Sequence, residues 1–485
     1  MTACGPSLGS ESAALAELCG ENAPVQLLPL GQDEAVTATP HAIVRNGDRW
    51  LIGVHTEVDT GEDQERIVSV DDCGGDANVV AEGYDQVLAP PRAGLPWVAC
   101  RQVGVIHEDM AWFDPEGRVP PRSLGSRACQ LAWVGDEVVF AVPSGDAYQL
   151  TVARFDAAGE VAAQEVLAND ISTWAHRTPV RNQSHTSYAI LSAPRVAEEP
   201  TGHLYAVTTS DELLDVEVGT RQLTVVGRYA GGIRSIVADD QIVAMRGESA
   251  FVVDLAQGDV AEYADVQSGI NGGPYLGSGS VTVTRNSVAN GNTYAVTRGD
   301  MLDHVLPSTL LYPVGEGDGG RIYFFGSTRD HRGLFTWRPD SPIYRTESPE
   351  FLAGPALSAW HDGDLYAVTR WTAEPSEDEP EYDLVRFVGP SLTAEVLFRD
   401  VYDPLPLPGG RWVSVREDSE TSGALTVLTP GDDRGTVVDE GVDRELAAFQ
   451  GGPARAVDTD TDATVVYVVT RGGRRGVWLL ELEPS

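Results

Sequence analysis

The stretch "LSAWHDGDLYAVT", residues 357–369, contains the pattern that decides the fold. Two runs that alternate between apolar and polar residues flank a short turn of Asp and Gly. A period of two is typical of a β-strand with one buried face. Gly and Asp suit the turn because the two-residue loop of a hairpin requires a positive φ. The stretch therefore predicts a β-hairpin.

The same hairpin recurs along the chain, for example in "HAIVRNGDRWLIGV" (41–54) and "QLAWVGDEVVFAV" (130–142), with a weaker copy at 97–107. A second hairpin lies between copies, as in "YDLVRFVGPSLTAEVLF" (382–398). Each unit is thus four strands in roughly 40–50 residues, which is the size of a β-propeller blade. One turn residue from each clear copy is Gly47, Gly135, Gly202, Asp240, Gly279, Gly319, Gly363, Gly409 and Asp460.

Counting the weak copy, the chain holds ten units. Seven or eight blades remain possible if residues 97–126 and 171–188 are irregular loops. Two smaller propellers are the other alternative, but no proline-rich or charged linker divides the chain. The last unit supplies only three strands, and residues 23–31 can add the fourth. The sequence therefore predicts an all-β propeller of four-stranded antiparallel blades over 23–485, closed by an N-terminal strand.

The first 22 residues differ from the repeats. Thr2-Ala3-Cys4 resembles the end of a bacterial lipoprotein signal, in which the cysteine becomes the lipidated first residue. The polar "GPSLGSES" after it resembles the tether of such proteins, and residues 10–23 favour one short helix. The resemblance is to β-propeller lipoproteins of bacteria in general. It implies export to the cell envelope or periplasm, with lipidation of Cys4 as the only membrane attachment.

The cysteines support the same compartment. Apart from Cys4, four remain, and none of them lies in a CxxC pair. An even number suits two disulfides in an oxidising environment. We expect Cys100 to pair with Cys129, because "WVACRQ" and "SRACQL" look like equivalent inner strands of successive units. Cys19 would then pair with Cys73.

The charge of the chain limits its partners. It has 73 acidic residues against 34 basic ones, a net charge of −39, and the sequence contains no lysine. Such a surface repels nucleic acid and anionic lipid and favours cations. The missing lysine excludes Schiff-base chemistry and a Walker A site. We expect a monomer that binds no nucleic acid.

One segment departs from the repeat. Residues 172–188, "STWAHRTPVRNQSHTSY", contain aromatic, basic and imidazole side chains and no acidic residue. That combination favours a loop that binds an anionic or glycan-like group, with Trp174 as the stacking face. A solvated connector is the alternative interpretation. The candidate ligand-binding residues are Trp174, His176, Arg177, Arg181 and His185.

A weaker candidate lies in "VDTDTDAT". A strand would place Asp458, Asp460 and Asp462 on one face, where their oxygens could hold a hard cation such as calcium. A hydrated turn is the other interpretation, and no other cofactor is expected. As a whole, the sequence favours a binding or scaffolding protein for a protein or glycan partner. The alternative is an extracellular hydrolase or lyase with its active site in the propeller funnel.

Overall fold

The computed structural model describes residues 24–482 with gaps, of which the longest are 177–195, 264–274, 346–356, 370–382 and 444–454. Within these residues every regular element is a β-strand, apart from the 3₁₀ turn η2 (Gly472–Arg474). No helix in the described part is long and apolar enough to span a membrane. The expected short helix at 10–23 lies outside the described residues. The predicted all-β class is confirmed.

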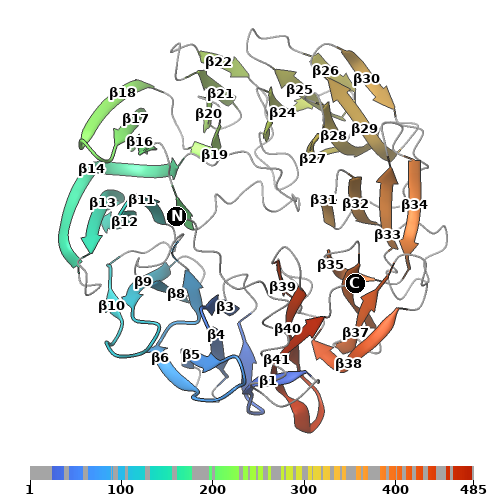
Figure 1. Ribbon diagram of the computed structural model, residues 1–485. Coiled ribbons are helices and arrows are strands. Elements are labelled where there is room, and N and C mark those ends of the chain that lie inside the picture. Colours follow the sequence, from blue (N-terminus) through green and yellow to red (C-terminus); the bar gives the residue numbers. More distant parts are fainter. Residues whose placement is uncertain are drawn as a thin grey trace, which may run out of the picture.

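The described strands form ten units, which we number blade 1 to blade 10, and Figure 1 shows them arranged in a ring. Blade 1 has five strands, and each of the others is built on four. Neighbouring strands within each blade pair antiparallel. Blade 1 contains β2 (Glu34–Val36) and β3 (Ile43–Asn46), which both pair with β4 (Arg49–Thr56), then β5 (Gln64–Asp71) and β6 (Asn78–Glu82). Blade 2 contains β7 (Gln86–Leu88), β8 (Trp97–Val103), β9 (His107–Phe113) and β10 (Arg122–Ser123).

Blades 3 and 4 share one long strand. Blade 3 contains β11 (Leu131–Val134), β12 (Glu137–Ser144), β13 (Ala147–Phe155) and the first half of β14 (Val161–His176). The second half of β14 is the inner strand of blade 4, which continues with β16 (His203–Thr208), β17 (Glu212–Glu217) and β18 (Gln222–Arg228). Asp170, with φ of 57°, gives β14 the bend between its halves. A short strand, β15 (Val196–Glu198), pairs parallel with β11.

The next four blades follow the same order. Blade 5 is β19 (Ile233–Ala238), β20 (Gln241–Arg246), β21 (Ser249–Asp254) and β22 (Val260–Tyr263). Blade 6 is β23 (Tyr275–Gly277), β24 (Ser280–Ser287), β25 (Gly291–Thr297) and β26 (His304–Pro307). Blade 7 is β27 (Leu310–Gly317), β28 (Arg321–Ser327), β29 (Arg332–Arg338) and β30 (Ser341–Arg345). Blade 8 is β31 (Leu357–His361), β32 (Asp364–Thr369), β33 (Asp383–Val388) and β34 (Thr393–Phe398).

The last two blades complete the ring. Blade 9 is β35 (Tyr402–Pro406), β36 (Trp412–Glu417), β37 (Ser422–Leu428) and β38 (Thr436–Asp443). Blade 10 is β39 (Arg455–Asp458), β40 (Ala463–Val469), β41 (Gly476–Leu482) and, from the other end of the chain, β1 (Val25–Pro29). β1 pairs antiparallel with β41, with Val25 opposite Leu479. The prediction that residues 23–31 supply the last strand is confirmed.

The core lies between blades rather than inside a single sheet. One cluster of buried side chains joins blade 10 to blade 1 through β1, and others join blades 1 and 2, 2 and 3, 3 and 4, 8 and 9, and 9 and 10. Leu27 of β1 is fully buried in the first of these. Each blade therefore needs its neighbours to bury both faces, which is why the repeats have to close into a ring.

One detail of the repeat prediction is wrong. The weak copy at 97–107 is not an inner hairpin, because Trp97–Val103 forms β8, the second strand of blade 2. The strand that follows Cys129 in the sequence, β11, is the first strand of blade 3. Cys100 therefore lies on a second strand rather than on the inner strand that we expected, and Cys129 lies outside the described residues, so their pairing stays a prediction.

Candidate functional site

A polar pocket of about 750 Å³ opens where the turns of blades 1 and 2 meet. Its walls come from three separate turns, namely β3–β4, β5–β6 and β9–β10. Six of the lining residues are polar or charged, and the other two are Gly47 and Ala77. The polar residues are Asn46, Asp48, Arg49, Asp76, Asn78 and Glu116.

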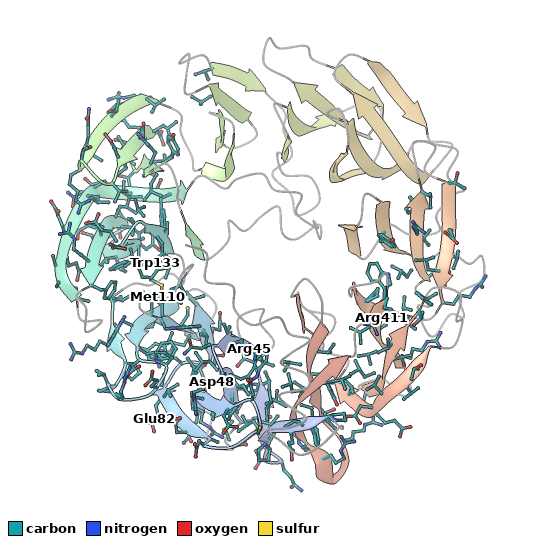
Figure 2. All side chains as sticks on the ribbon, viewed as in Figure 1. Arg45, Asp48, Glu82, Met110, Trp133 and Arg411 are labelled. Carbon is teal, nitrogen blue, oxygen red and sulfur yellow. The ribbon has the colours of Figure 1, made fainter. Side chains whose placement is uncertain are left out.

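The β3–β4 turn has its shape because of Gly47. Asn46 pairs with Arg49 across the hairpin, so Gly47 and Asp48 are the two loop residues. Gly47 has φ of 63°, and a Cβ atom there would meet no atom within 4 Å, so strain rather than space favours glycine. Asp48 is consequently exposed at the tip of the hairpin. Arg45 and Asp48 lie on the inner side of blade 1, and Glu82 lies on its outer side (Figure 2).

The β5–β6 turn is held by its own aspartate. The Asp71 Oδ1 atom accepts hydrogen bonds from the backbone N–H groups of Cys73, at 2.9 Å, and Gly75, at 2.6 Å. This local capping shapes the loop and presents Asp76, with φ of 46°, toward the pocket.

Arg49 links the two turns of blade 1. Its Nη2 atom donates to the backbone oxygen of Asp76 at 2.8 Å, and its Nε atom donates to the Ser69 hydroxyl at 2.8 Å. The guanidinium is thus used to hold the wall of the pocket.

Beneath the turns, a second arginine holds a half-buried carboxylate. Asp72 accepts hydrogen bonds from Trp50 Nε1, at 2.8 Å, and Arg45 Nη2, at 3.1 Å. Burial raises the pKa of the Asp72 carboxyl above its usual value, although Arg45 opposes the shift. The Arg45 guanidinium also lies 5.5 Å from the centre of the Trp50 ring. These contacts fix the β3–β4 hairpin against β5.

The carboxylates of the pocket differ in their partners. Glu116 forms an ion pair with Arg118 at 3.1 Å, and Arg118 also binds Asp114. Within the described residues, the side-chain carboxylates of Asp48 and Asp76 have no hydrogen-bond or ion-pair partner. The pocket therefore offers two free carboxylates beside two amide side chains.

Only the first five residues of the predicted loop at 172–188 are described, and they form a strand. Residues up to His176 form the end of β14, where Trp174 pairs with Ala206 of β16. Trp174 is 7% exposed and belongs to the core between blades 3 and 4, so its predicted role as an exposed stacking face is wrong. The reason is that the second half of β14 serves as the inner strand of blade 4. His176 ends the strand, and Arg177, Arg181 and His185 lie outside the described residues.

The predicted cation site falls mainly outside the described residues. Asp458 is the last residue of β39, and Asp460 and Asp462 lie beyond the described part. No group of three or more His, Cys, Asp or Glu side chains in the described ranges is placed to hold a metal ion. The calcium site stays a prediction.

The cysteines are also only partly described. Cys73 and Cys100 are disulfide-bonded. Their expected partners, Cys19 and Cys129, lie outside the described residues, as does Cys4. The two pairings and the lipidation therefore stay predictions.

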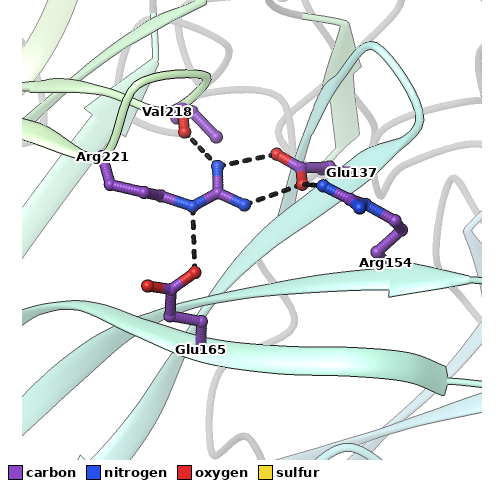
Figure 3. A network of polar contacts seen from close by, with 5 residues as sticks. All are labelled: Glu137, Arg154, Glu165, Val218 and Arg221. Atoms are coloured by element: carbon purple, nitrogen blue, oxygen red, sulfur yellow. Dashed lines mark hydrogen bonds and ion pairs between the residues drawn. The ribbon is translucent and has the colours of Figure 1, made fainter.

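Partly buried charged side chains connect strands and neighbouring blades through ion pairs. Figure 3 shows Arg221 of the β17–β18 turn reaching from blade 4 to Glu137 and Glu165 of blade 3, with Glu137 also bound by Arg154. The hydrogen bonds from Arg221 and the other contacts hold the pKa of Glu137 below its usual value, although partial burial opposes this. These charged groups bind one another and hold the two blades together, whereas the carboxylates of Asp48 and Asp76 have no such partner among the described residues.

The pocket was not predicted, although its residues stand in stretches that indicated turns. Asn46–Arg49 are the loop of the first repeat, and Asp76–Asn78 belong to "DDCGGDAN". The sequence identifies each as a tight turn. It does not show that turns from two neighbouring blades meet.

No protein-family model and no curated protein matches the sequence. Among solved structures, the chain is similar to an oligogalacturonate lyase in complex with manganese, with 13% identity over 72% of this chain and 96% of that chain and a TM-score of 0.31. It is also similar to the β-propeller domain of the Trilobed protease from Pyrococcus furiosus, with 11% identity over 84% of this chain and 98% of that chain and a TM-score of 0.30. A third similar structure is BamB from Moraxella catarrhalis, with 14% identity over 73% of this chain and 93% of that chain and a TM-score of 0.29. At these identities and TM-scores the likeness carries nothing about function.

Proposed function

We propose that the protein is a binding or scaffolding propeller whose pocket between blades 1 and 2 receives a lysine or arginine side chain of a partner protein. The observation that carries this proposal is the pair of free carboxylates, Asp48 and Asp76, in a pocket of about 750 Å³. A cation placed between them gains charge-assisted hydrogen bonds, which are roughly twice as strong as neutral ones.

The rest of the pocket supports a cationic group. Its one lining arginine, Arg49, already donates to Ser69 and to the backbone of Asp76, so its position is fixed. The amide oxygens of Asn46 and Asn78 are further acceptors for an ammonium or guanidinium group. The net charge of −39 adds a long-range attraction that raises the rate of encounter with a basic partner.

Rigidity of the walls supports the same function. The hairpin that bears Asp48 is held by Arg45, Asp72 and Trp50, and the turn that bears Asp76 is held by Asp71 and Arg49. Turns that are already fixed lose little conformational entropy when a partner binds. A propeller with fixed turns is suited to present such a site to another protein.

The test is binding of a defined basic peptide by isothermal titration. The probe is acetyl-Gly-Gly-Lys-Gly-Lys-Gly-Gly-amide, compared with the same peptide acetylated on both lysines. The double variant Asp48→Asn/Asp76→Asn should weaken binding at least fivefold. The matched control, Asp136→Asn/Asp146→Asn, removes the same charge from turns of blade 3 and should weaken it less than twofold. Equal losses in both variants, or equal binding of the acetylated peptide, would contradict the proposal, and so would selective binding of a glycan in this pocket.

Export and anchoring belong to the same proposal. A lipid on Cys4, followed by a polar tether, would keep the ring at the surface of a membrane with its turns free to meet a partner. Mass analysis of the protein purified from its native cell envelope tests this part. Diacylglycerol on Cys4 is the expected result, and an unmodified Cys4 in that material would contradict it.

A further inference from the structure

A second surface, separate from the pocket, lies on the outer rim of blade 4. β18 is the last strand of its sheet, and Figure 1 shows it at the periphery of the ring. One edge of β18 pairs with β17, and no described strand pairs with the other edge. Its first four residues are exposed, and the side chains of Leu223 and Val225 are 44% and 57% exposed.

β18 differs in this respect from other outer strands of the ring. Strands β1, β6, β34 and β38 each bury at least one side chain, whereas none of the seven residues of β18 is buried. The two-residue outer strand β10 is also exposed, but both of its residues, Arg122 and Ser123, are polar. Proteins usually protect a free edge with charges, proline or a covering segment, because an apolar edge invites another strand. Among the residues that the structure describes, nothing protects the first half of β18 in this way.

The two apolar side chains continue the core to the surface. Val225 is paired with Leu214 and Leu223 with Val216, and both partners belong to the buried cluster between blades 3 and 4. Leu223 and Val225 are two residues apart, so they lie on one face of the strand. A segment that bound here would bury apolar area on top of an existing core.

Each end of β18 carries an ion pair, and the more exposed member of the pair is acidic at the start of the strand and basic at its end. Near its start, Arg221 contacts Glu165, which is 59% exposed, and Glu217 is paired with Gln222. At its end, Arg228 is 76% exposed and forms an ion pair with Glu212. An antiparallel segment is therefore complementary if an acidic residue precedes its apolar pair, near Arg228, and a basic residue follows, near Glu165.

We propose that β18 is a docking edge for an extended segment of a partner protein, which adds as an antiparallel strand along residues 222–225. The segment carries an acidic residue, two apolar residues at positions i and i+2, and a basic residue, in that order. The hydrogen bonds of the main chain supply affinity and the alternating side chains supply specificity. The register shift between Leu213 and Leu214 limits the straight part of the edge to these few residues.

The test uses the full chain and the peptide acetyl-Glu-Thr-Val-Thr-Val-Thr-Lys-amide. Hydrogen exchange should show that the amides of 222–225 exchange quickly in the free protein and slow down when the peptide is added. The peptide with the charges exchanged, Lys-Thr-Val-Thr-Val-Thr-Glu, should bind at least fivefold more weakly. Amides of β18 that are already protected in the free protein would overturn the proposal, because another segment of the chain would then cover the edge.

A matched pair of variants makes the test specific. Val225→Asp should raise the Kd of the peptide at least tenfold, whereas Val437→Asp, at an equally exposed valine of β38, should change it less than twofold. Asp48→Asn/Asp76→Asn should leave binding at β18 unchanged, so failure of this proposal is distinguishable from failure of the pocket. Equal effects of the two valine variants would overturn the proposal. A dimer in sedimentation velocity that Val225→Asp abolishes would also overturn it, because the occupant would then be a second copy.

Discussion

Arg221 forms a two-point ion pair with Glu137, and the two residues stand in different blades, 84 positions apart in the sequence. The Nη1 and Nη2 atoms of Arg221 lie 2.8 and 2.7 Å from the two carboxylate oxygens, and Nη1 also donates to the backbone oxygen of Val218. Arg221 adopts φ of 63°, in the left-handed region that non-glycine residues avoid. The strained backbone of the turn therefore places the Arg221 side chain where it fixes blade 4 to blade 3.

Replacing Arg221 should weaken that joint. Arg221→Met leaves Glu137, a largely buried carboxylate, with Arg154 as its remaining partner among the described residues, and should lower the free energy of unfolding by about 1–2 kcal/mol. Arg221→Lys should recover part of the loss, because one amine cannot reproduce both bonds. Urea denaturation measures the change. Arg228→Met, which removes an exposed pair on the same hairpin, is the control and should cost less than about 0.5 kcal/mol.

Closure of the ring should depend on β1. Leu27→Ala removes a fully buried side chain between blades 10 and 1 and should cost about 3 kcal/mol. Gly476→Ala should be comparably harmful, because a Cβ atom there would lie 2.4 Å from the backbone oxygen of Leu28. Thermal unfolding and hydrogen exchange of β41 report both effects. Val161→Ala, on an exposed outer position, is the control, and a ring whose β41 amides stay protected in Leu27→Ala would contradict closure by β1.

The fold was predictable where it depends on local pattern. The turn residue, the alternation of period two and the unit length define the repeat, and the three strands of the last unit indicate the missing fourth. The joint between blades 3 and 4 was not predictable, because nothing local shows that β14 bends at Asp170 and serves two blades. For the same reason Trp174 looked like a loop residue although it is part of a core.

The turns of the candidate site could also be predicted from local sequence, whereas the way in which they come together could not. Gly47 and Asp48 are identifiable as a turn from the sequence alone, because glycine there meets a conformational need. Their approach to Asp76 depends on how the two turns of blade 1 are linked, and their approach to Glu116 depends on how blade 2 packs against blade 1. Such packing is decided by buried residues such as Ala99 and Phe113, which carry no functional signal in the sequence.

Acid should destabilise the contact between blades 9 and 10 through one carboxylate. Asp439 accepts hydrogen bonds from the Tyr467 hydroxyl at 2.6 Å and from both terminal nitrogens of Arg474, at 2.7 and 3.0 Å. Burial alone would raise the pKa of the Asp439 carboxyl, but these donors hold that pKa below its usual value. A lowered pKa in the folded state means that the stabilisation is complete above the unfolded pKa, near 4, and is lost as the pH falls through the folded value.

Asp439→Asn should therefore be less stable than the wild type at pH 7, by about 2 kcal/mol, and the difference should shrink as the pH falls below the pKa of an unfolded aspartate, near 4. Urea denaturation across this range, followed by tryptophan fluorescence, measures it. Asp443→Asn, on the same strand, is the control. A difference that is independent of pH would show that the charge of Asp439 does not stabilise the joint.

The disulfides give a separate prediction. Gly74 lies against the backbone of β1, since a Cβ atom there would be 2.1 Å from the Gln26 oxygen. Cys73 is therefore beside the strand that Cys19 precedes in the sequence, which supports the pairing of Cys19 with Cys73. Peptide mapping under non-reducing conditions should find this link together with Cys100–Cys129. A link between Cys19 and Cys100 would contradict the predicted pairing.

The most direct test of the central claim, that the pocket between blades 1 and 2 receives a basic side chain of a partner, uses the absence of lysine from the chain. A carbodiimide couples carboxylates to amines without a spacer, so apart from its own N-terminus every such link formed by this protein must join it to another molecule. We predict that treatment of native cell envelopes gives links from Asp48 or Asp76 to a lysine of one partner protein, and that Asp48→Asn/Asp76→Asn abolishes the adduct while Asp136→Asn/Asp146→Asn retains it. Links scattered over surface carboxylates, with the adduct unchanged in the pocket variant, would contradict the claim.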